Sequence, residues 1–142
     1  MIKVLFVCHG NICRSPMAEL AFRDMVTKAG LADRFEIASV GVSNEEAGNP
    51  VYPPARQQLA AHGISAKGKY AKKITQSDVD YYDHIFYMDS SNGRALRRMF
   101  PQETKFRSFL SRDVADPWYY GNFDQTWRDI EEGCTAILNE LK

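Results

Sequence analysis

The sequence predicts an α/β domain in three layers, in which a mainly parallel sheet is covered by helices on both faces. Short apolar runs rich in β-branched residues alternate along the chain with stretches of helical periodicity, as in βαβ units. No linker, repeat or low-complexity tract interrupts this alternation. The chain has 142 residues, 44% of them hydrophobic, which is enough for one core. We therefore expect a single domain over residues 1–142.

The first strand and the first helix are predicted to meet in a turn at the carboxyl edge of the sheet. Residues 2–7 are apolar and predict a buried strand. Ser15 is a good N-cap, and Pro16 suits the first helical position because its missing N–H needs no partner there. The helix should end at Gly30, and its apolar positions are Ala18, Ala21, Phe22, Met25, Val26 and Ala29. Ligands of α/β domains bind at this edge of the sheet, where Cys8 falls.

The rest of the chain continues the alternation. Strands are expected at 35–40, 84–88 and, from a weaker pattern, 105–109. Helices are expected at 55–62, 78–82 and 90–99, the last capped by Ser90 or Ser91. A C-terminal helix carries one apolar stripe, formed by Trp127, Ile130, Cys134, Ile137, Leu138 and Leu141. Cys134 is therefore expected to pack in the core.

The first turn carries the chemistry. It reads Cys8-His9-Gly10-Asn11-Ile12-Cys13-Arg14-Ser15. Gly10 and Asn11 tolerate left-handed backbone angles, which let successive N–H groups point inward and form an anion site reinforced by the following helix. A thiol in such a field is expected to be a thiolate, and Arg14 offers a fork of donors to a tetrahedral oxyanion. Ser15 could donate to the sulfur, and the Asn11 amide could lock the loop. A glycine-rich nucleotide loop is excluded, because no Lys-Ser/Thr pair follows a glycine at the required spacing.

Composition narrows the class of protein. Eighteen basic and eighteen acidic residues give a net charge of zero, so there is no bulk electrostatic case for nucleic acid or membrane partners. The apolar run at the start is too short to span a membrane and lacks a cleavage site. Three cysteines favour a reducing, cytoplasmic compartment over a disulfide framework. His9, His62 and His84 lack the spacing of metal ligands, so no metal or cofactor is expected. We expect a monomer or weak self-association.

Over essentially its whole length the chain resembles the low-molecular-weight protein tyrosine phosphatases. The likeness is carried by the octet with Pro16 and Ala18-Glu19, Ser39-Val40-Gly41, Gly48-Asn49-Pro50, His62-Gly63-Ile64, Met88-Asp89-Ser90-Ser91-Asn92 and Asp116-Pro117-Trp118-Tyr119. The resemblance implies a four-stranded parallel sheet in the order 2-1-3-4. It also implies a metal-independent phosphatase without cofactors that acts on tyrosine-phosphorylated proteins.

The resemblance also implies roles for individual residues. Cys8 would be the nucleophile that forms a phosphocysteine, and Arg14 and the loop amides would bind phosphate or other oxyanions. Asp116 would be general acid and then general base, although Asp-Pro by itself is only a turn signal. The implied substrate-binding residues are His9, Gly10, Asn11, Ile12, Cys13, Ser15, Glu45, Trp118 and Tyr119, with Ser39 and Lys69 in support.

Several positions depart from the family pattern. Glu45 stands where relatives usually place an aromatic wall of the cleft, and a carboxylate there should repel a phosphate dianion by about 1 kcal/mol at 4 Å in water. Lys69 replaces a histidine that supports the loop, so it either points inward as a cation donor or leaves that support missing. Tyr52 replaces an acidic residue. Trp118, Tyr119 and Tyr120 are candidates for the remaining cleft wall.

Cys13 and three alternative functions stay open. Cys13 could trap oxidised Cys8 as a disulfide, as the resemblance favours, or it could simply pack beneath the anion site. A phosphoarginine phosphatase of the same fold tends to carry threonine where Ile12 stands. An arsenate reductase would need further cysteines between Cys13 and Cys134, and the sequence has none there. A weakly active phosphoprotein-binding or redox-sensing module is the remaining alternative.

Overall fold

Four parallel strands form the middle layer of the molecule in the computed structural model, which describes residues 1–142 apart from the side chains of Tyr119 and Tyr120. The strands are β1 (Ile2–Cys8), β2 (Phe35–Gly41), β3 (His84–Tyr87) and β4 (Phe106–Ser108). Their order in the sheet is β2-β1-β3-β4, which confirms the expected order. Cys8 at the end of β1 lies opposite Gly41 of β2, and Val7 lies opposite Tyr87 of β3.

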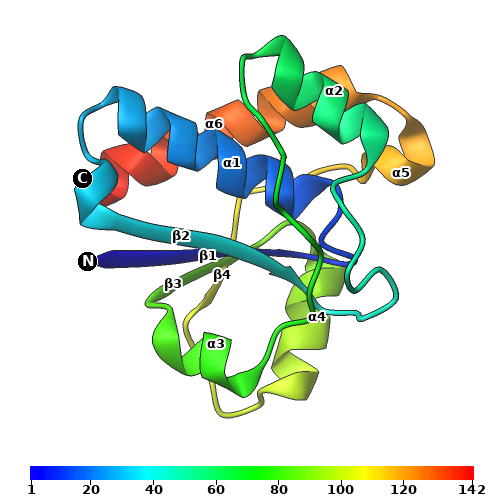
Figure 1. The fold of residues 1–142 in the computed structure, drawn as a ribbon. Helices are drawn as coiled ribbons and strands as arrows, with labels where there is room; N and C mark the ends of the chain where they lie inside the picture. The colour runs from blue at the N-terminus through cyan, green and yellow to red at the C-terminus, as the bar shows by residue number, and fades with distance from the viewer.

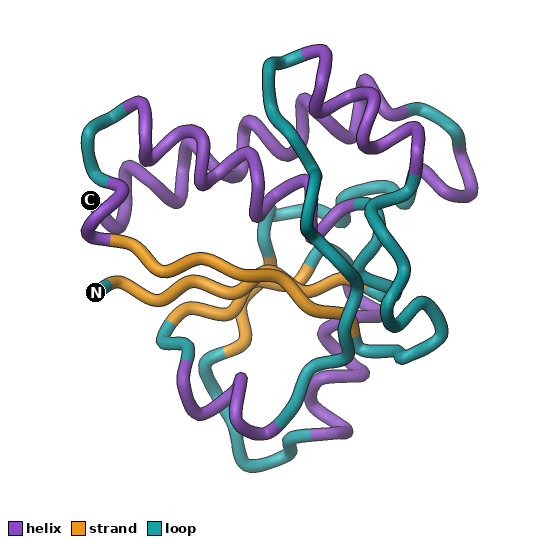
Figure 2. Tube along the Cα trace, in the orientation of Figure 1, coloured by secondary structure: helices purple, strands orange, loops and turns teal.

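Helices cover both faces of this sheet (Figure 1). On one face lie α1 (Arg14–Lys28), α2 (Pro53–Ala61), α5 (Pro117–Tyr120) and α6 (Phe123–Leu141), and on the other lie α3 (Gln76–Tyr81) and α4 (Ser90–Met99). A 3-10 turn, η1 (Ala32–Arg34), precedes β2. Figure 2 shows the same three layers, with the strands between the two groups of helices. Among the residues that the structure describes, no helix is both long and apolar enough to cross a membrane.

The core has two parts because side chains of a strand alternate between the faces of a sheet. Phe6 points to the α1/α6 side, where its ring contacts those of Phe22 and Phe109 with centroids 5.8 Å apart in each pair. Leu5 and Val7 point to the other side. Cys134 is fully buried in the first part, with its sulfur 3.7 Å from the carbonyl oxygen of Ala18, so its predicted packing role is confirmed.

Two predicted helix caps were wrong. Helix α1 begins at Arg14 with Cys13 as the N-cap residue, because the Ser15 hydroxyl is bonded to Asn11 and Cys8 instead of to the helix amides. Helix α4 is capped by Asp89, not by Ser90 or Ser91. The Asp89 carboxylate accepts from the Asn92 N–H, and the Asn92 side chain accepts from the Asp89 N–H, which is a complete capping box.

Candidate active site

The loop between β1 and α1 curls around the sulfur of Cys8. Asn11 has φ +61°, and its N–H lies 3.3 Å from Cys8 Sγ. Gly10 does not adopt the left-handed conformation, so Asn11 alone supplies the left-handed turn that both were expected to allow. Gly41 makes room for the loop, because a Cβ there would lie 2.6 Å from the carbonyl oxygen of His9. The loop thus directs the backbone N–H of Asn11 toward a buried thiol, as an anion site requires.

The Asn11 side chain ties this loop to the sheet. Its amide nitrogen donates to Ser15 Oγ at 2.8 Å and to Ser39 Oγ at 3.0 Å, and its oxygen accepts from the Lys72 N–H at 3.1 Å. Ser15 Oγ in turn lies 2.9 Å from Cys8 Sγ. Because Ser15 Oγ accepts from Asn11, its own hydrogen is left for one of two acceptors, Cys8 Sγ at 2.9 Å or the Val40 carbonyl at 3.4 Å, and the sulfur is the nearer of the two. The network therefore points a hydroxyl donor at Cys8.

A buried carboxylate orients the far end of the network. Glu19 on α1 is 4% exposed, and its Oε1 accepts from Ser39 Oγ at 2.7 Å. Because the Ser39 hydroxyl donates its hydrogen to Glu19, its oxygen is left to accept from Asn11. Lys69 Nζ lies 3.0 Å from Glu19 Oε1 and donates to the Ser39 carbonyl at 2.9 Å, while Arg23 pairs with the other carboxylate oxygen at 2.9 Å. Lys69 therefore points inward and supports the loop through Glu19 and Ser39, not by touching it.

Arg14 lies on the opposite side of the thiol, 2% exposed. Its Nη1 donates to Asp89 Oδ2 and to the Val114 carbonyl, both at 2.8 Å, and its Nη2 lies 3.3 Å from Asp116 Oδ2. Burial lowers the pKa of Arg14, but the nearby charges of Cys8 and Asp116 and the bond to Asp89 outweigh this, so that the pKa is raised. Arg14 is a permanent cation held in a fixed orientation by three acceptors.

Asp116 is placed by the helix that it begins. It is the N-cap residue of α5, and its Oδ1 accepts from the Trp118 N–H at 3.1 Å. Its other oxygen contacts Arg14, which brings the carboxyl to the same cavity as the thiol. A carboxyl group and a nucleophile in one cavity can act on the two sides of a bond that breaks.

The cavity that these groups share has a volume of about 160 Å³. It contains most of the predicted site residues, namely Cys8, His9, Gly10, Ile12, Cys13, Arg14, Glu45, Asp116 and Trp118, together with Glu46. A larger, more open hollow of about 620 Å³ continues from it past Asp89 and Asp113. The side chains of Asn11, Ser15 and Ser39 are not part of this lining and instead bond to one another. The mouth of the cavity is acidic.

One wall of the cavity is aromatic. Trp118 is 51% exposed, and its ring lies 4.6 Å from that of Tyr52, measured between centroids. Tyr52 is itself fastened to the loop, since its N–H donates to the Ile12 carbonyl at 2.9 Å. Glu45 lies elsewhere at the mouth and is 3.6 Å from His9 Nε2. The wall positions expected for Tyr119 and Tyr120 involve side chains outside the described part of the structure.

Three contributors were missed from the sequence. Asp89 follows the end of β3, and its place at the carboxyl edge of the sheet could have indicated a site residue. Glu19 carries no local signal beyond its spacing to Arg23, because its partners come from distant parts of the chain. Lys72 contributes through its backbone N–H, which no side-chain motif reveals.

Within the described residues, no group of three His, Cys, Asp or Glu side chains could hold a metal ion.

The comparisons with known proteins agree with this geometry. Residues 3–142 match the family described as "Low molecular weight phosphotyrosine protein phosphatase". The protein-tyrosine-phosphatase YfkJ of Bacillus subtilis is 38% identical, over 100% of this chain and 97% of its own. Its crystal structure has a TM-score of 0.96 and covers 99% of this chain and 94% of that one.

Two further similar proteins carry the names of two different phosphatase activities. A low molecular weight phosphotyrosine protein phosphatase of Schizosaccharomyces pombe is 44% identical, over 85% of this chain and 83% of its own. The crystal structure of DARP, a Drosophila arginine phosphatase, has a TM-score of 0.90 at 31% identity and covers 99% of this chain and 98% of that one. The same fold therefore occurs under the names of two phosphatase activities.

Replacing Lys69 by methionine tests the inward support. The variant keeps the length of the side chain but leaves Glu19 with fewer partners, so we expect a loss of roughly 1–3 kcal/mol in the free energy of unfolding. A loosened loop should lower kcat by about tenfold or more. Urea unfolding and steady-state kinetics measure the two effects. Lys73→Met, at an exposed position nearby, is the matched control, and Lys69→Arg should restore most of the loss. Unchanged stability and kcat in Lys69→Met would contradict the role of Lys69.

Proposed function

The chain belongs to the low-molecular-weight phosphotyrosine protein phosphatase family, and we propose that it hydrolyses phosphotyrosine in proteins, with Cys8 as the nucleophile. The observation that carries the proposal is the meeting of three groups at one small cavity: a thiol in a loop of donors, a buried arginine and a carboxyl group. In this proposal the phosphorylated proteins are cytoplasmic. Arg14 and the loop amides are the phosphate ligands, and Asp116 is the general acid and base.

The first step transfers the phosphoryl group to sulfur. The Cys8 thiolate attacks phosphorus, the S–P bond forms, and the bond to the phenolic oxygen breaks while Asp116 donates its proton to that oxygen. Arg14 and the loop amides hold the three equatorial oxygens, so that charge developing on them meets fixed donors. The Ser15 hydroxyl, oriented by Asn11, keeps the sulfur in place.

The second step returns the enzyme to its starting state. The Asp116 carboxylate takes a proton from water, the water oxygen attacks phosphorus, and the S–P bond breaks to release inorganic phosphate and the Cys8 thiolate. Arg14 contacts Asp116 at 3.3 Å, so the proposed phosphate ligand and the proposed general acid and base lie side by side in both steps. A phosphate dianion competes with Asp116 for this guanidinium.

Hydrolysis of p-nitrophenyl phosphate in EDTA, with phosphotyrosine and phosphoarginine peptides beside it, tests the proposed function. We expect turnover of both aryl phosphates without added metal, no turnover by Cys8→Ser, and phosphoenzyme formation slowed by roughly 10²–10⁴-fold in Asp116→Asn. Cys13→Ser is the matched control, since it alters the other thiol of the loop. Turnover by Cys8→Ser at the wild-type rate would eliminate the nucleophile. Selective hydrolysis of phosphoarginine would instead assign the activity that DARP's name records.

Glu45 should weaken the binding of small phosphate esters. Its carboxylate is largely exposed at the mouth of the cavity, and at 4 Å in water it would repel each negative charge of the ester by about 1 kcal/mol, which is close to a fivefold effect per charge. We therefore expect Glu45→Gln to raise kcat/KM for p-nitrophenyl phosphate about two- to fivefold, and less at high salt. Asp33→Asn, at the opposite end of β2, is the control. An unchanged kcat/KM at low salt would show that Glu45 does not affect the substrate. The same charge should favour phosphotyrosine flanked by Lys or Arg.

Cys13 is proposed as a reversible redox partner of Cys8. Burial and the neighbouring charge of Cys8 raise the pKa of the Cys13 thiol well above its ordinary value, so Cys13 is protonated at neutral pH. After peroxide converts the Cys8 thiolate to a sulfenic acid, the small thiolate fraction of Cys13 attacks that sulfur. The S–O bond breaks, hydroxide leaves and takes a proton from solvent to become water, and a disulfide forms. Because the thiolate fraction of Cys13 grows with pH, closure should accelerate from pH 7 to pH 9.

The redox role is measured by recovery after oxidation. Wild type and Cys13→Ser are treated with peroxide and then with dithiothreitol, and the regained activity is compared. Cys13→Ser should regain less activity, because its sulfenic acid continues to irreversible acids. Cys134→Ser is a poor control because that thiol lies in the core, so Cys13→Ala serves as the second variant. Equal recovery in all three proteins would reject the role.

A further inference from the structure

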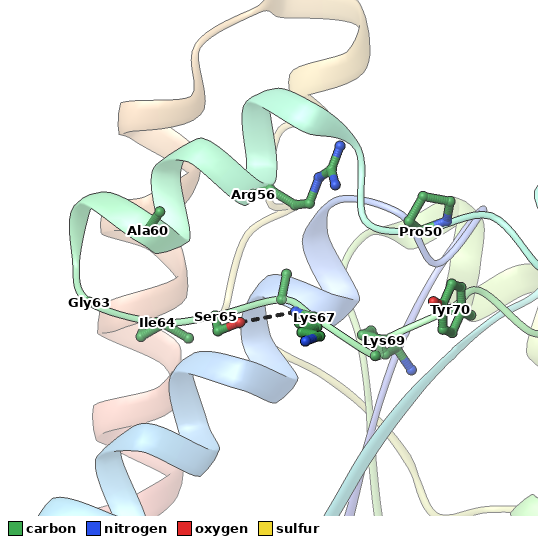
Figure 3. A pocket seen from close by; sticks show the side chains of 11 residues that line it. Pro50, Arg56, Ala60, Gly63, Ile64, Ser65, Lys67, Lys69 and Tyr70 are labelled. Carbon is green, nitrogen blue, oxygen red and sulfur yellow. Dashed lines mark hydrogen bonds between the residues drawn. The ribbon is translucent and has the colours of Figure 1, made fainter.

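The charged residues that line a second cavity are all cations. It has a volume of about 590 Å³ and lies between α2 and the segment 63–70 (Figure 3). Arg56 comes from α2, whereas Lys67 and Lys69 come from the segment. No Asp or Glu lines it, whereas carboxylates line the active-site cavity, the hollow that adjoins it and a further cavity between α1 and α6. We call this cavity the α2 groove.

The lining combines charge with apolar surface. Arg56 and Lys67 are exposed, and neither has a carboxylate within 4.0 Å among the residues that the structure describes. Ile64 and Ala66 are partly buried and pack against the main core, so they form an apolar floor. Pro50 and Tyr70 close one end, and Tyr70 is 58% exposed. The groove therefore offers a hydrocarbon surface with two unpaired cations, and its size is within the usual range for small molecules.

The groove also touches the support of the phosphate-binding loop. Lys69 lines it, while Lys69 Nζ is bonded to Glu19 and to the Ser39 carbonyl. Figure 3 shows Lys69 pointing away from α2 toward β2. Ser39 Oγ accepts from Asn11, whose backbone N–H reaches Cys8 Sγ. One cation thus stands between the groove and the network that shapes the active-site loop.

We propose that the α2 groove binds a small organic polyanion, with at least two carboxylates or phosphates on an apolar body, and that the bound anion slows turnover by drawing Lys69 away from Glu19 and Ser39. Arg56 and Lys67 hold the anionic groups, and Ile64 and Ala66 contact the apolar body. The Lys69 ammonium group cannot contact the bound anion and keep its contacts with Glu19 and the Ser39 carbonyl. Occupancy of the groove therefore weakens the hydrogen bonds that hold the Asn11 side chain, and kcat falls. The effect on turnover rests on the proposed function, whereas binding at the groove does not.

Benzene-1,3,5-tricarboxylate is the probe, because it joins three carboxylates to a flat apolar ring. In an amide ¹⁵N–¹H NMR titration of the wild type we expect saturable shifts of Arg56 and residues 63–70. The double variant R56Q/K67Q should bind at least about tenfold more weakly, since two ionic contacts are lost. K73Q/R94Q carries the same change of charge at exposed positions outside the groove and should bind like the wild type. Should the double variant lose its fold, R56Q and K67Q alone are each expected to show part of the loss.

Kinetics with p-nitrophenyl phosphate separate the groove from the active site. In the wild type and in K73Q/R94Q the probe should lower kcat with KM little changed, and R56Q/K67Q should resist this inhibition. Shifts confined to residues 8–15, or competitive inhibition that persists in R56Q/K67Q, would overturn the proposal by placing the anion at the phosphate-binding loop. Absence of binding in a protein that hydrolyses aryl phosphates would reject the groove and leave the proposed function intact. Binding without any change in kcat would overturn the link through Lys69.

Discussion

The arrangement depends on one asparagine held in a left-handed conformation by its own side chain. A non-glycine residue with φ near +60° costs roughly 1–2 kcal/mol, and Asn11 offsets that cost with three side-chain hydrogen bonds. Those bonds fix the loop against Ser15, Ser39 and Lys72, so the backbone N–H of Asn11 stays aimed at Cys8. Without this turn the chain would run from β1 into α1 with its donors pointing elsewhere.

The direction of each bond in the network follows from a buried charge. Glu19 can only accept, so it takes the hydrogen of Ser39, which leaves Ser39 to accept from Asn11 and Ser15 free to donate to sulfur. Lys69 and Arg23 pair with the two oxygens of that buried carboxylate. On the other side of the thiol, Asp89 fixes Arg14 in the same way. Each buried charge of the site thus has a partner that also sets its orientation.

The net charge of the chain is zero, but acidic and basic side chains are distributed unevenly over its cavities. The cavity around Cys8 has Glu45, Glu46 and Asp116 among its lining residues, so its mouth repels dianions that are not accompanied by cationic groups. The α2 groove has the opposite lining. Lys69 lines the groove and is also paired with Glu19. An anion bound in the groove would therefore compete with Glu19 for the Lys69 ammonium group.

Local patterns predicted the elements well, and tertiary contacts decided what they could not predict. The sheet order, the strand at 2–7, the C-terminal helix and the grouping of Cys8, Arg14 and Asp116 at one edge followed from periodicity, spacing and the family resemblance. Ser15 was wrongly assigned as a cap because its local signal was outcompeted by Asn11 and Cys8. Glu19 and the orientation of Lys69 could not be predicted, since their partners lie on α1, β2 and the segment after α2, which only the fold brings together.

The central claim is that the thiol of Cys8 itself accepts the phosphoryl group. Acid quenching during turnover of a phosphorus-labelled aryl phosphate, followed by peptide mapping under acidic conditions by mass spectrometry, measures this directly. We expect one phosphoryl group on the peptide that contains Cys8, formed and lost at rates that match turnover. Steady turnover with no phosphorus–sulfur adduct, or label on another residue, would contradict it.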